Sequence, residues 1–191
     1  MLSWRLIRQQ YDLIIRVAAT RLAVLGLYIF AALESIIIPI PVDPLLVATV
    51  LAQPSRWRQL ALGCTLASVI GGVVGWALGK FLSPYLHEWL AILPETLAAP
   101  AAFAAVKVGF AKFGIFLVFL GAFSPPPYKV IAVSAGIGGF ALLPFILTSI
   151  IGRGLRFVII AGIAKNKRNP KVVILLISIL VCLFAGTLWL I

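Results

Sequence analysis

Residues Pro39-Ile40-Pro41-Val42-Asp43-Pro44 interrupt an apolar stretch that runs from residue 22 to residue 52. Proline lacks a backbone N–H and clashes with the preceding helical turn, so three prolines in six residues exclude one continuous helix. Each arm is then about 10–18 residues, or roughly 15–27 Å as helix, whereas the hydrocarbon core of a bilayer is about 30 Å thick. In a lipid environment, the stretch predicts a helical hairpin over residues 22–52 that reaches the midplane and returns.

The composition indicates that the surrounding solvent is lipid. Of 191 residues, 63% are hydrophobic and 11% are charged. A soluble domain carries about 45–50% apolar and about 25% charged residues. A soluble chain this apolar would expose large hydrophobic patches and aggregate. We therefore expect an all-α polytopic membrane protein.

A second proline cluster, Ser124-Pro125-Pro126-Pro127-Tyr128-Lys129, interrupts another long apolar stretch. The same argument divides that stretch into a hairpin over residues 113–138 and a spanning helix over residues 140–164. Both predicted hairpins would be re-entrant, because neither arm of a hairpin crosses the bilayer.

The remaining segments complete the predicted organisation. Residues 59–82 and 172–191 each fit one spanning helix of about 20 residues, which gives about three spanning helices in all. Residues 1–21 place apolar and basic side chains on different sides at helical spacing, which is typical of a helix in the headgroup layer. Residues 83–112 are expected outside the membrane, with a helix start at Ser83-Pro84.

The order of hairpin and then spanning helix occurs twice, and the positive-inside rule orients the two copies. Cytoplasmic loops of membrane proteins carry an excess of Lys and Arg. With re-entrant hairpins, one membrane face holds Arg5, Arg8, Arg16, Arg21, Arg56, Arg58, Lys165, Lys167, Arg168 and Lys171. The hairpins then enter from opposite faces, as in the inverted-topology repeats of secondary transporters. We expect a bacterial inner membrane protein with a cytoplasmic N-terminus and the C-terminus outside.

Five ionisable side chains fall within the predicted bilayer region: Glu34, Asp43, Lys129, Arg153 and Arg156. Each costs about 2.5–3.5 kcal/mol at a helix centre, so these groups must pair or face water. Three bases against two acids favour an anionic guest. The alternative is a buried ion-pair lock, such as Glu34 with Arg153, that has no role in transport.

Other residue patterns point to packing rather than to chemistry. Gly71, Gly75 and Gly79 repeat every four residues, a spacing that lets a second helix approach closely. The sequence holds one histidine and no visible nucleophile–base arrangement, so we expect no enzyme, metal site or cofactor. The net charge of +11 lies in short stretches beside apolar segments, which does not indicate nucleic-acid binding.

Together these motifs resemble the DedA family, also called the VTT or SNARE-associated Golgi protein domain, over roughly residues 22–164. The resemblance rests on Glu34 before the Pro-x-Pro break with Asp43, the glycine helix at 71–79, the segment from Gly121 to Lys129, and Gly152-Arg153-Gly154-Leu155-Arg156-Phe157. The last two motifs resemble the short YqaA-like branch. The resemblance implies movement of phospholipids or undecaprenyl phosphate between leaflets, with coupling to protons in some members.

The sequence thus predicts a translocase for a phospholipid, a lipid phosphate or a related anionic headgroup. Arg153, Arg156 and Lys129 would attract the phosphate, since a guanidinium matches phosphate oxygens. Protonation of Glu34 or Asp43 would release a basic partner and couple transport to protons. The expected partners are membrane lipids, protons and a second copy of the chain in a homo-oligomer. The alternative is a non-transporting membrane scaffold whose buried charges are structural.

Overall fold

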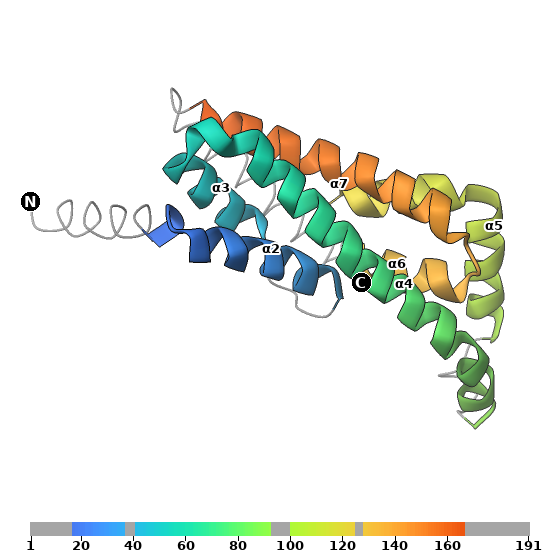
Figure 1. Cartoon of the computed structure of the whole chain (residues 1–191). Coiled ribbons are helices and arrows are strands. Elements are labelled where there is room, and N and C mark those ends of the chain that lie inside the picture. The colour runs from blue at the N-terminus through green and yellow to red at the C-terminus, as the bar shows by residue number, and fades with distance from the viewer. Residues whose placement is uncertain (1–16, 37–40, 93–99, 125–127, 167–191) are drawn as a thin grey trace, which may run out of the picture.

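The computed structural model of the protein describes residues 17–36, 41–92, 100–124 and 128–166. Within those ranges the chain is helical and has no strand, which confirms the predicted all-α class (Figure 1). The elements are α2 (Arg21–Ile36), α3 (Asp43–Ala52), η1 (Pro54–Arg56), α4 (Trp57–Ile92), α5 (Pro100–Phe123), α6 (Tyr128–Ile137) and α7 (Leu142–Lys165).

Several predicted features lie outside the described residues. They are most of the interfacial helix at 1–21, the prolines Pro39, Pro125, Pro126 and Pro127, and the helix at 172–191. We use "chain breaks" for the two proline-containing interruptions between helices, at residues 37–42 and 124–127. Both are bounded by described helices. Helix α2 ends at Ile36 and α3 begins at Asp43, while α5 ends at Phe123 and α6 begins at Tyr128.

Among the described residues, three helical segments are long and apolar enough to cross a membrane: Pro54–Tyr85, Val106–Phe123 and Leu142–Lys165. The first segment contains all of residues 59–82, where a spanning helix is predicted. The third contains all but the first two residues of the one predicted at 140–164. The second differs from the prediction, because it belongs to the first arm of the hairpin expected at 113–138. Helix α5 already begins at Pro100, since proline suits the first helical position and the alanines that follow favour helix.

Helix α4 also runs further than expected. Residues 83–92 continue it, with Pro84 inside the helix, so the predicted helix start at Ser83-Pro84 is wrong. A proline removes one helical hydrogen bond, and long apolar helices tolerate that loss where other groups satisfy the freed carbonyl. The segment expected outside the membrane is therefore helical at both of its described ends.

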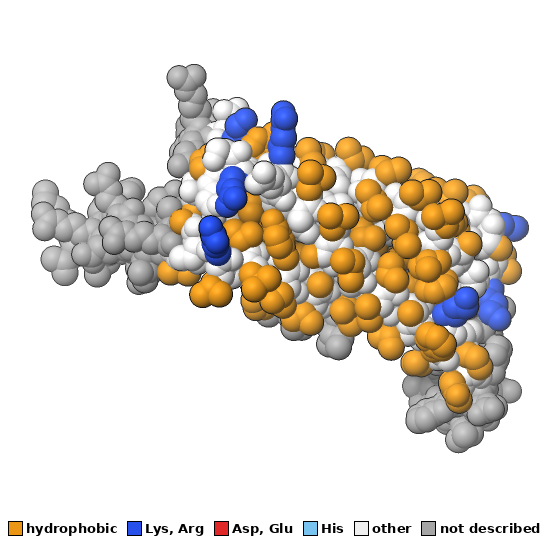
Figure 2. Space-filling model, viewed as in Figure 1, with side chains coloured by type: hydrophobic (Ala, Val, Ile, Leu, Met, Phe, Trp, Pro, Cys, Tyr) orange, Lys and Arg blue, Asp and Glu red, His pale blue; other side chains and the backbone are white. Residues whose placement is uncertain are grey.

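The polarity of the helix bundle is inverted relative to a soluble protein. Along α4, every fourth residue from Leu62 to Leu78 is an exposed hydrophobic side chain. On α7, Leu155 is 46% exposed, whereas Arg153, two residues earlier, is 2% exposed. Figure 2 shows hydrophobic side chains over the middle of one face and Lys and Arg toward its ends. Such a surface fits a lipid environment and indicates a membrane protein.

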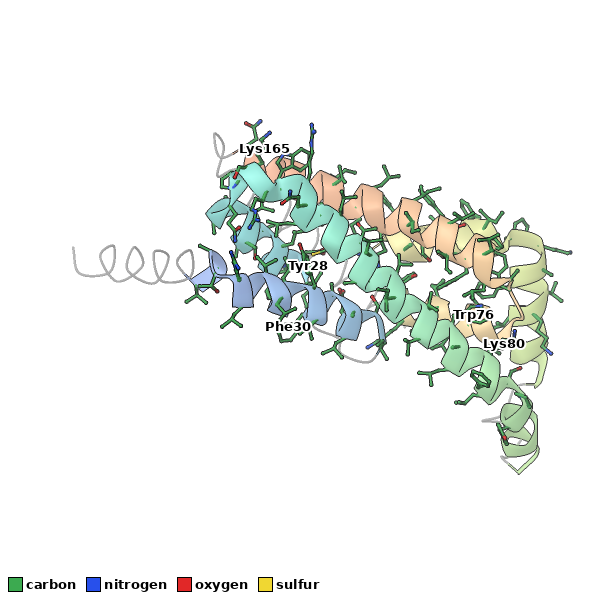
Figure 3. All side chains as sticks on the ribbon, in the orientation of Figure 1. Tyr28, Phe30, Trp76, Lys80 and Lys165 are labelled. Carbon is green, nitrogen blue, oxygen red and sulfur yellow. The ribbon has the colours of Figure 1, made fainter. Side chains whose placement is uncertain are left out.

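Distant parts of the chain meet at one end of the bundle, where several basic residues lie. The amide of Gln53 donates to the carbonyl oxygens of Ala18 and Ala19, at 3.4 and 3.2 Å, so the end of α3 returns to the start of α2. Arg58 and Lys165 both lie 5.3 Å from the ring of Trp57. Figure 3 shows Lys165 and Lys80 at opposite ends of the bundle.

The glycine stripe of α4 brings two other helices close to it. A Cβ at Gly71 would meet the backbone of α2 at Ala32, and one at Gly79 would meet the backbone of α6 at Val133. Gly75 lies between them, with the Ala132 Cβ at 3.3 Å from the position of such an atom. The stripe thus lets α2 and α6 approach α4 closely.

Two hydrophobic clusters make up the core. One joins α2 and α3 to the beginning of α4 and the end of α7, and includes Leu46 and Phe157. The other joins α5 and α6 to later residues of α4 and earlier residues of α7, and includes Tyr128 and Phe145. Arg153 lies on α7 between Phe145 and Phe157, so the charged residues lie where the two clusters meet.

Candidate functional site

Arg156 on α7 connects the ends of both chain breaks. One of its terminal nitrogens, Nη2, forms an ion pair with Oδ2 of Asp43, the first residue of α3. The other, Nη1, donates to the carbonyl oxygen of Ser124, which follows α5, at 2.8 Å. The side chains of Arg156 and Asp43 are 9% and 5% exposed, so the pair is shielded from solvent. One guanidinium therefore holds the start of α3 and the end of α5 together.

Arg153, one turn earlier on α7, has a different environment. Its guanidinium carbon lies 4.4 Å from the ring centroid of Tyr128 and 5.7 Å from that of Phe157. Its Nη2 donates to the hydroxyl of Ser35 at 3.5 Å, the outer limit of a hydrogen bond. Glu34 precedes Ser35 on α2. Aromatic faces and one long hydrogen bond thus hold a fully buried cation.

Three buried side-chain atoms in the described part of the chain lack a hydrogen-bond partner: Glu34 Oε2, Asp43 Oδ1 and Arg153 Nε. All three belong to the predicted site residues. Leaving a buried polar atom unpaired costs about 1–3 kcal/mol, and more for a charged group. Such atoms require an explanation, for which an ordered water or a polar ligand is the usual physical candidate. One hydrogen-bond donor, Arg153 Nε, and two acceptor oxygens, on Glu34 and Asp43, therefore remain at this site.

Two pairs of hydroxyl groups flank Arg153. Ser35 on α2 and Ser68 on α4 are hydrogen-bonded at 2.7 Å, and Ser35 donates to the carbonyl oxygen of Ala31 at 3.0 Å. On the other side, the Tyr128 hydroxyl donates to Ser149 on α7 at 2.7 Å. These hydroxyls extend the polar site across four helices.

Sequence reasoning grouped five ionisable residues, and four of them have buried polar atoms in this part of the described structure: Glu34, Asp43, Arg153 and Arg156. Lys129 is half-buried next to Tyr128, and it makes an interaction of its own. The sequence did not single out Ser35, Ser68, Tyr128 or Ser149. Gly72 makes room for Tyr128, because a Cβ there would meet its ring and hydroxyl. A glycine in the sequence does not reveal which side chain it accommodates, so this contact could not be predicted.

Removing the Tyr128 hydroxyl tests the hydroxyl pairs. We expect Tyr128→Phe to lower the free energy of unfolding by about 0.5–1.5 kcal/mol, because Ser149 loses a buried hydrogen-bond donor. Tyr85, which is 63% exposed on α4, gives the matched control Tyr85→Phe, for which no measurable change is expected. Urea unfolding of the full chain in detergent micelles provides the measurement. Equal effects of the two substitutions would contradict the buried role of Tyr128.

No group of three or more His, Cys, Asp or Glu residues that could hold a metal ion occurs among the residues that the structure describes. The site is instead a balanced cluster of two acids and two arginines, lined by hydroxyls and aromatic rings. Such an arrangement can bind charged groups or exchange ion-pair partners.

Comparison with known proteins identifies two bacterial relatives, both described only as uncharacterized. A protein from Haemophilus influenzae is 32% identical over 154 residues, and one from Histophilus somni is 32% identical over 158 residues. Each match covers 81% of this chain and 78% of the relative. No family model matches the chain, and no solved structure matches it significantly. The similarity to the two relatives therefore extends over most of both chains.

Proposed function

The chain belongs to the family of these Haemophilus influenzae and Histophilus somni proteins, and we propose that it is a membrane transport protein that moves a phospholipid or lipid phosphate across the bilayer. The observation that carries the proposal is the buried cluster of Glu34, Asp43, Arg153 and Arg156 with its three unpaired polar atoms. A purely structural ion-pair network would be expected to satisfy its buried atoms. Unsatisfied charged atoms inside a membrane indicate a site for a polar guest.

The proposal includes two re-entrant hairpins, formed by α2 with α3 and by α5 with α6. Helices α3 and α6 have 10 residues each, or about 15 Å as helix, which is half of the hydrocarbon thickness. The return of Gln53 to Ala18 and Ala19 supports a first hairpin that begins and ends on one face. Irregular backbone at the breaks is tolerable in the membrane only where protein or a polar cavity surrounds it.

An inverted repeat is supported by the pattern of helix contacts. Helix α4 packs against α2 and α6, and α7 packs against α5 and α3. Exchanging the unit α2–α4 with the unit α5–α7 converts one set of contacts into the other. Ser68-Val69-Ile70-Gly71 and Ser149-Ile150-Ile151-Gly152 occur in the two long helices, and each glycine packs near the end of the first helix of its unit. Transporters of this architecture bind substrate near the midplane between their repeats.

In this proposal the arginines of the cluster attract the phosphate, and the carboxylates of Glu34 and Asp43 compete with the phosphate for those arginines. Protonation of an acid would weaken its hold on an arginine and couple lipid movement to a proton gradient. This mechanism and the order of the motifs agree with the resemblance to the DedA family. A location in a bacterial inner membrane, with Arg56, Arg58 and Lys165 on the cytoplasmic side, belongs to the same proposal.

Cysteine accessibility tests the proposed orientation. In a chain with Cys64 and Cys182 replaced by alanine, we expect a membrane-impermeant maleimide to label Lys112→Cys from outside. Arg56→Cys and Lys165→Cys should react only after the membrane is permeabilised, because both are placed on the cytoplasmic face. Labelling of Arg56→Cys and Lys165→Cys from different sides would exclude the arrangement.

Transport itself is tested with the full chain in liposomes that carry a fluorescent phospholipid. We expect wild-type protein to accelerate exchange of the lipid between leaflets. Glu34→Gln should lower that rate about tenfold or more, and a tenfold loss corresponds to an activation free energy raised by about 1.4 kcal/mol. Arg58→Gln, at an exposed position on the bundle end, is the matched control and should retain the rate.

Two results would contradict this function. Protein that has both Glu34→Gln and Asp43→Asn, remains folded and still moves lipid at the wild-type rate would exclude the mechanism. Folded wild-type protein that moves no phosphate-bearing lipid, with or without a pH gradient, would favour the membrane scaffold. The closed ion pair between Asp43 and Arg156 is the observation that suits that second function.

A further inference from the structure

The two buried arginines differ in how completely their hydrogen-bonding capacity is used. Arg156 binds the Asp43 carboxylate through one terminal nitrogen and the Ser124 carbonyl through the other. Arg153 has an unpaired Nε, and its Nη2 reaches Ser35 only at 3.5 Å. The difference is unexpected from the sequence, where the two lie three residues apart on one helix.

The weakly used edge of Arg153 has the geometry of an oxyanion fork. Nε and Nη2 form one side of the planar guanidinium, and two parallel N–H groups match two oxygens of a phosphate. The centroid of the Tyr128 ring lies 4.4 Å from the guanidinium carbon, a cation–π contact that restrains this group. Ser35 and its partner Ser68 lie beside the fork. Ser35 donates its hydrogen to the Ala31 carbonyl, so Ser68 is the hydroxyl that can turn its hydrogen from Ser35 to the same ligand.

Arg156 is poorly suited to bind a ligand. Moving it toward an anion would leave the Asp43 carboxylate buried without a cation, and it would also release the Ser124 carbonyl. Arg153 faces a smaller obstacle, since the described structure shows no carboxylate in an ion pair with it and its Nε has no hydrogen-bond partner. An incoming phosphate can therefore become the counter-ion of Arg153 without breaking an ion pair that the described structure shows.

Resting on the transport function proposed above, we propose that Arg153 is the phosphate-binding group of the site and that Arg156 is a positioning residue that ties the two chain breaks together. The ligand chemistry is a phosphate group, held by the Nε–Nη2 edge of Arg153 and by the hydroxyl of Ser68.

The test measures thermal unfolding of the full chain in detergent micelles with three probes. Dihexanoyl phosphatidic acid carries a lipid phosphate, dihexanoylglycerol has the same acyl chains without phosphate, and inorganic phosphate has no acyl chains. Ligand that binds the folded state raises the unfolding temperature with concentration. We expect phosphatidic acid, but not dihexanoylglycerol, to raise it for the wild-type protein.

The deciding variants keep the positive charge and remove the fork. Arg153→Lys is expected to weaken the apparent affinity for phosphatidic acid about tenfold or more, because lysine has no bidentate edge. Arg156→Lys is expected to lower the unfolding temperature without probe more than Arg153→Lys does, and to weaken probe binding less. Arg58→Gln is the control at an exposed arginine. The assignment is overturned if Arg156→Lys loses as much affinity as Arg153→Lys, or if Arg153→Lys binds like wild type.

The outcomes separate this inference from the transport function. If the wild type moves lipid but phosphatidic acid binds equally well without Arg153, the inference is overturned and the transport function stands. Suppose instead that inorganic phosphate raises the unfolding temperature in an Arg153-dependent way, while phosphatidic acid does not and no lipid moves. That result keeps the anion site and excludes lipid transport. Absence of a shift with either phosphate probe removes the assignment whatever the flux assay gives.

Discussion

Replacing Asp43 by asparagine, or Arg156 by glutamine, is expected to destabilise the folded protein by about 3–5 kcal/mol, which is the usual effect of removing one member of a buried ion pair. Both side chains are nearly inaccessible to solvent. Each substitution leaves the other charge buried without its counter-ion. Arg156→Gln also removes the donor to the Ser124 carbonyl, so it should be the more damaging of the two.

The double variant Asp43→Asn/Arg156→Gln is expected to recover most of that loss. Replacing a complete buried pair by neutral groups is often nearly neutral for stability, because two desolvated charges disappear together. The coupling energy from a double-mutant cycle then isolates the pair from the other effects of each substitution.

Urea unfolding of the full chain in detergent micelles measures these free energies, with Arg58→Gln as the control for removing an arginine at an exposed position. Single substitutions that act additively, with no recovery in the double variant, would show that Asp43 and Arg156 do not pair. The same data would then exclude the tie between the two chain breaks.

Alanine at Gly79 is expected to destabilise the protein by about 1–3 kcal/mol, the usual range for overpacking. A Cβ at Gly79 would overlap the carbonyl of Val133 on α6, and the reciprocal Gly136→Ala would overlap that of Trp76 on α4. Backbone atoms within helices cannot move aside as side chains do. The two helices would have to separate along their whole contact.

Gly26→Ala is the matched control, because Gly26 is also inside a helix and a Cβ there meets nothing within 4 Å. It is expected to stabilise the protein by up to about 1 kcal/mol, since alanine favours helix over glycine. The same unfolding assay compares the variants. Equal stability of Gly79→Ala and Gly26→Ala would contradict the close approach of α4 and α6.

The sequence by itself determined where the helices are interrupted and which side chains are costly to bury. Proline chemistry is local, so the clusters at 39–44 and 125–127 located both breaks without any tertiary information. The spacing of Gly71, Gly75 and Gly79 likewise located a face for close helix packing. Local rules were less reliable at Pro84 and Pro100, where a single proline is compatible with either a helix start or a helix interior.

Only the tertiary structure decided which charges meet. The sequence suggested Glu34 with Arg153 as one example of a lock, whereas the hydrogen-bonded pair joins Asp43 to Arg156, 113 residues apart. It also decided that Tyr128, Ser35 and Ser149 belong to the site. Pairing depends on how α3, α6 and α7 cross, and that crossing arises from contacts between distant segments. A helix periodicity reveals which face a residue occupies, but it carries no information about the partner on the facing helix.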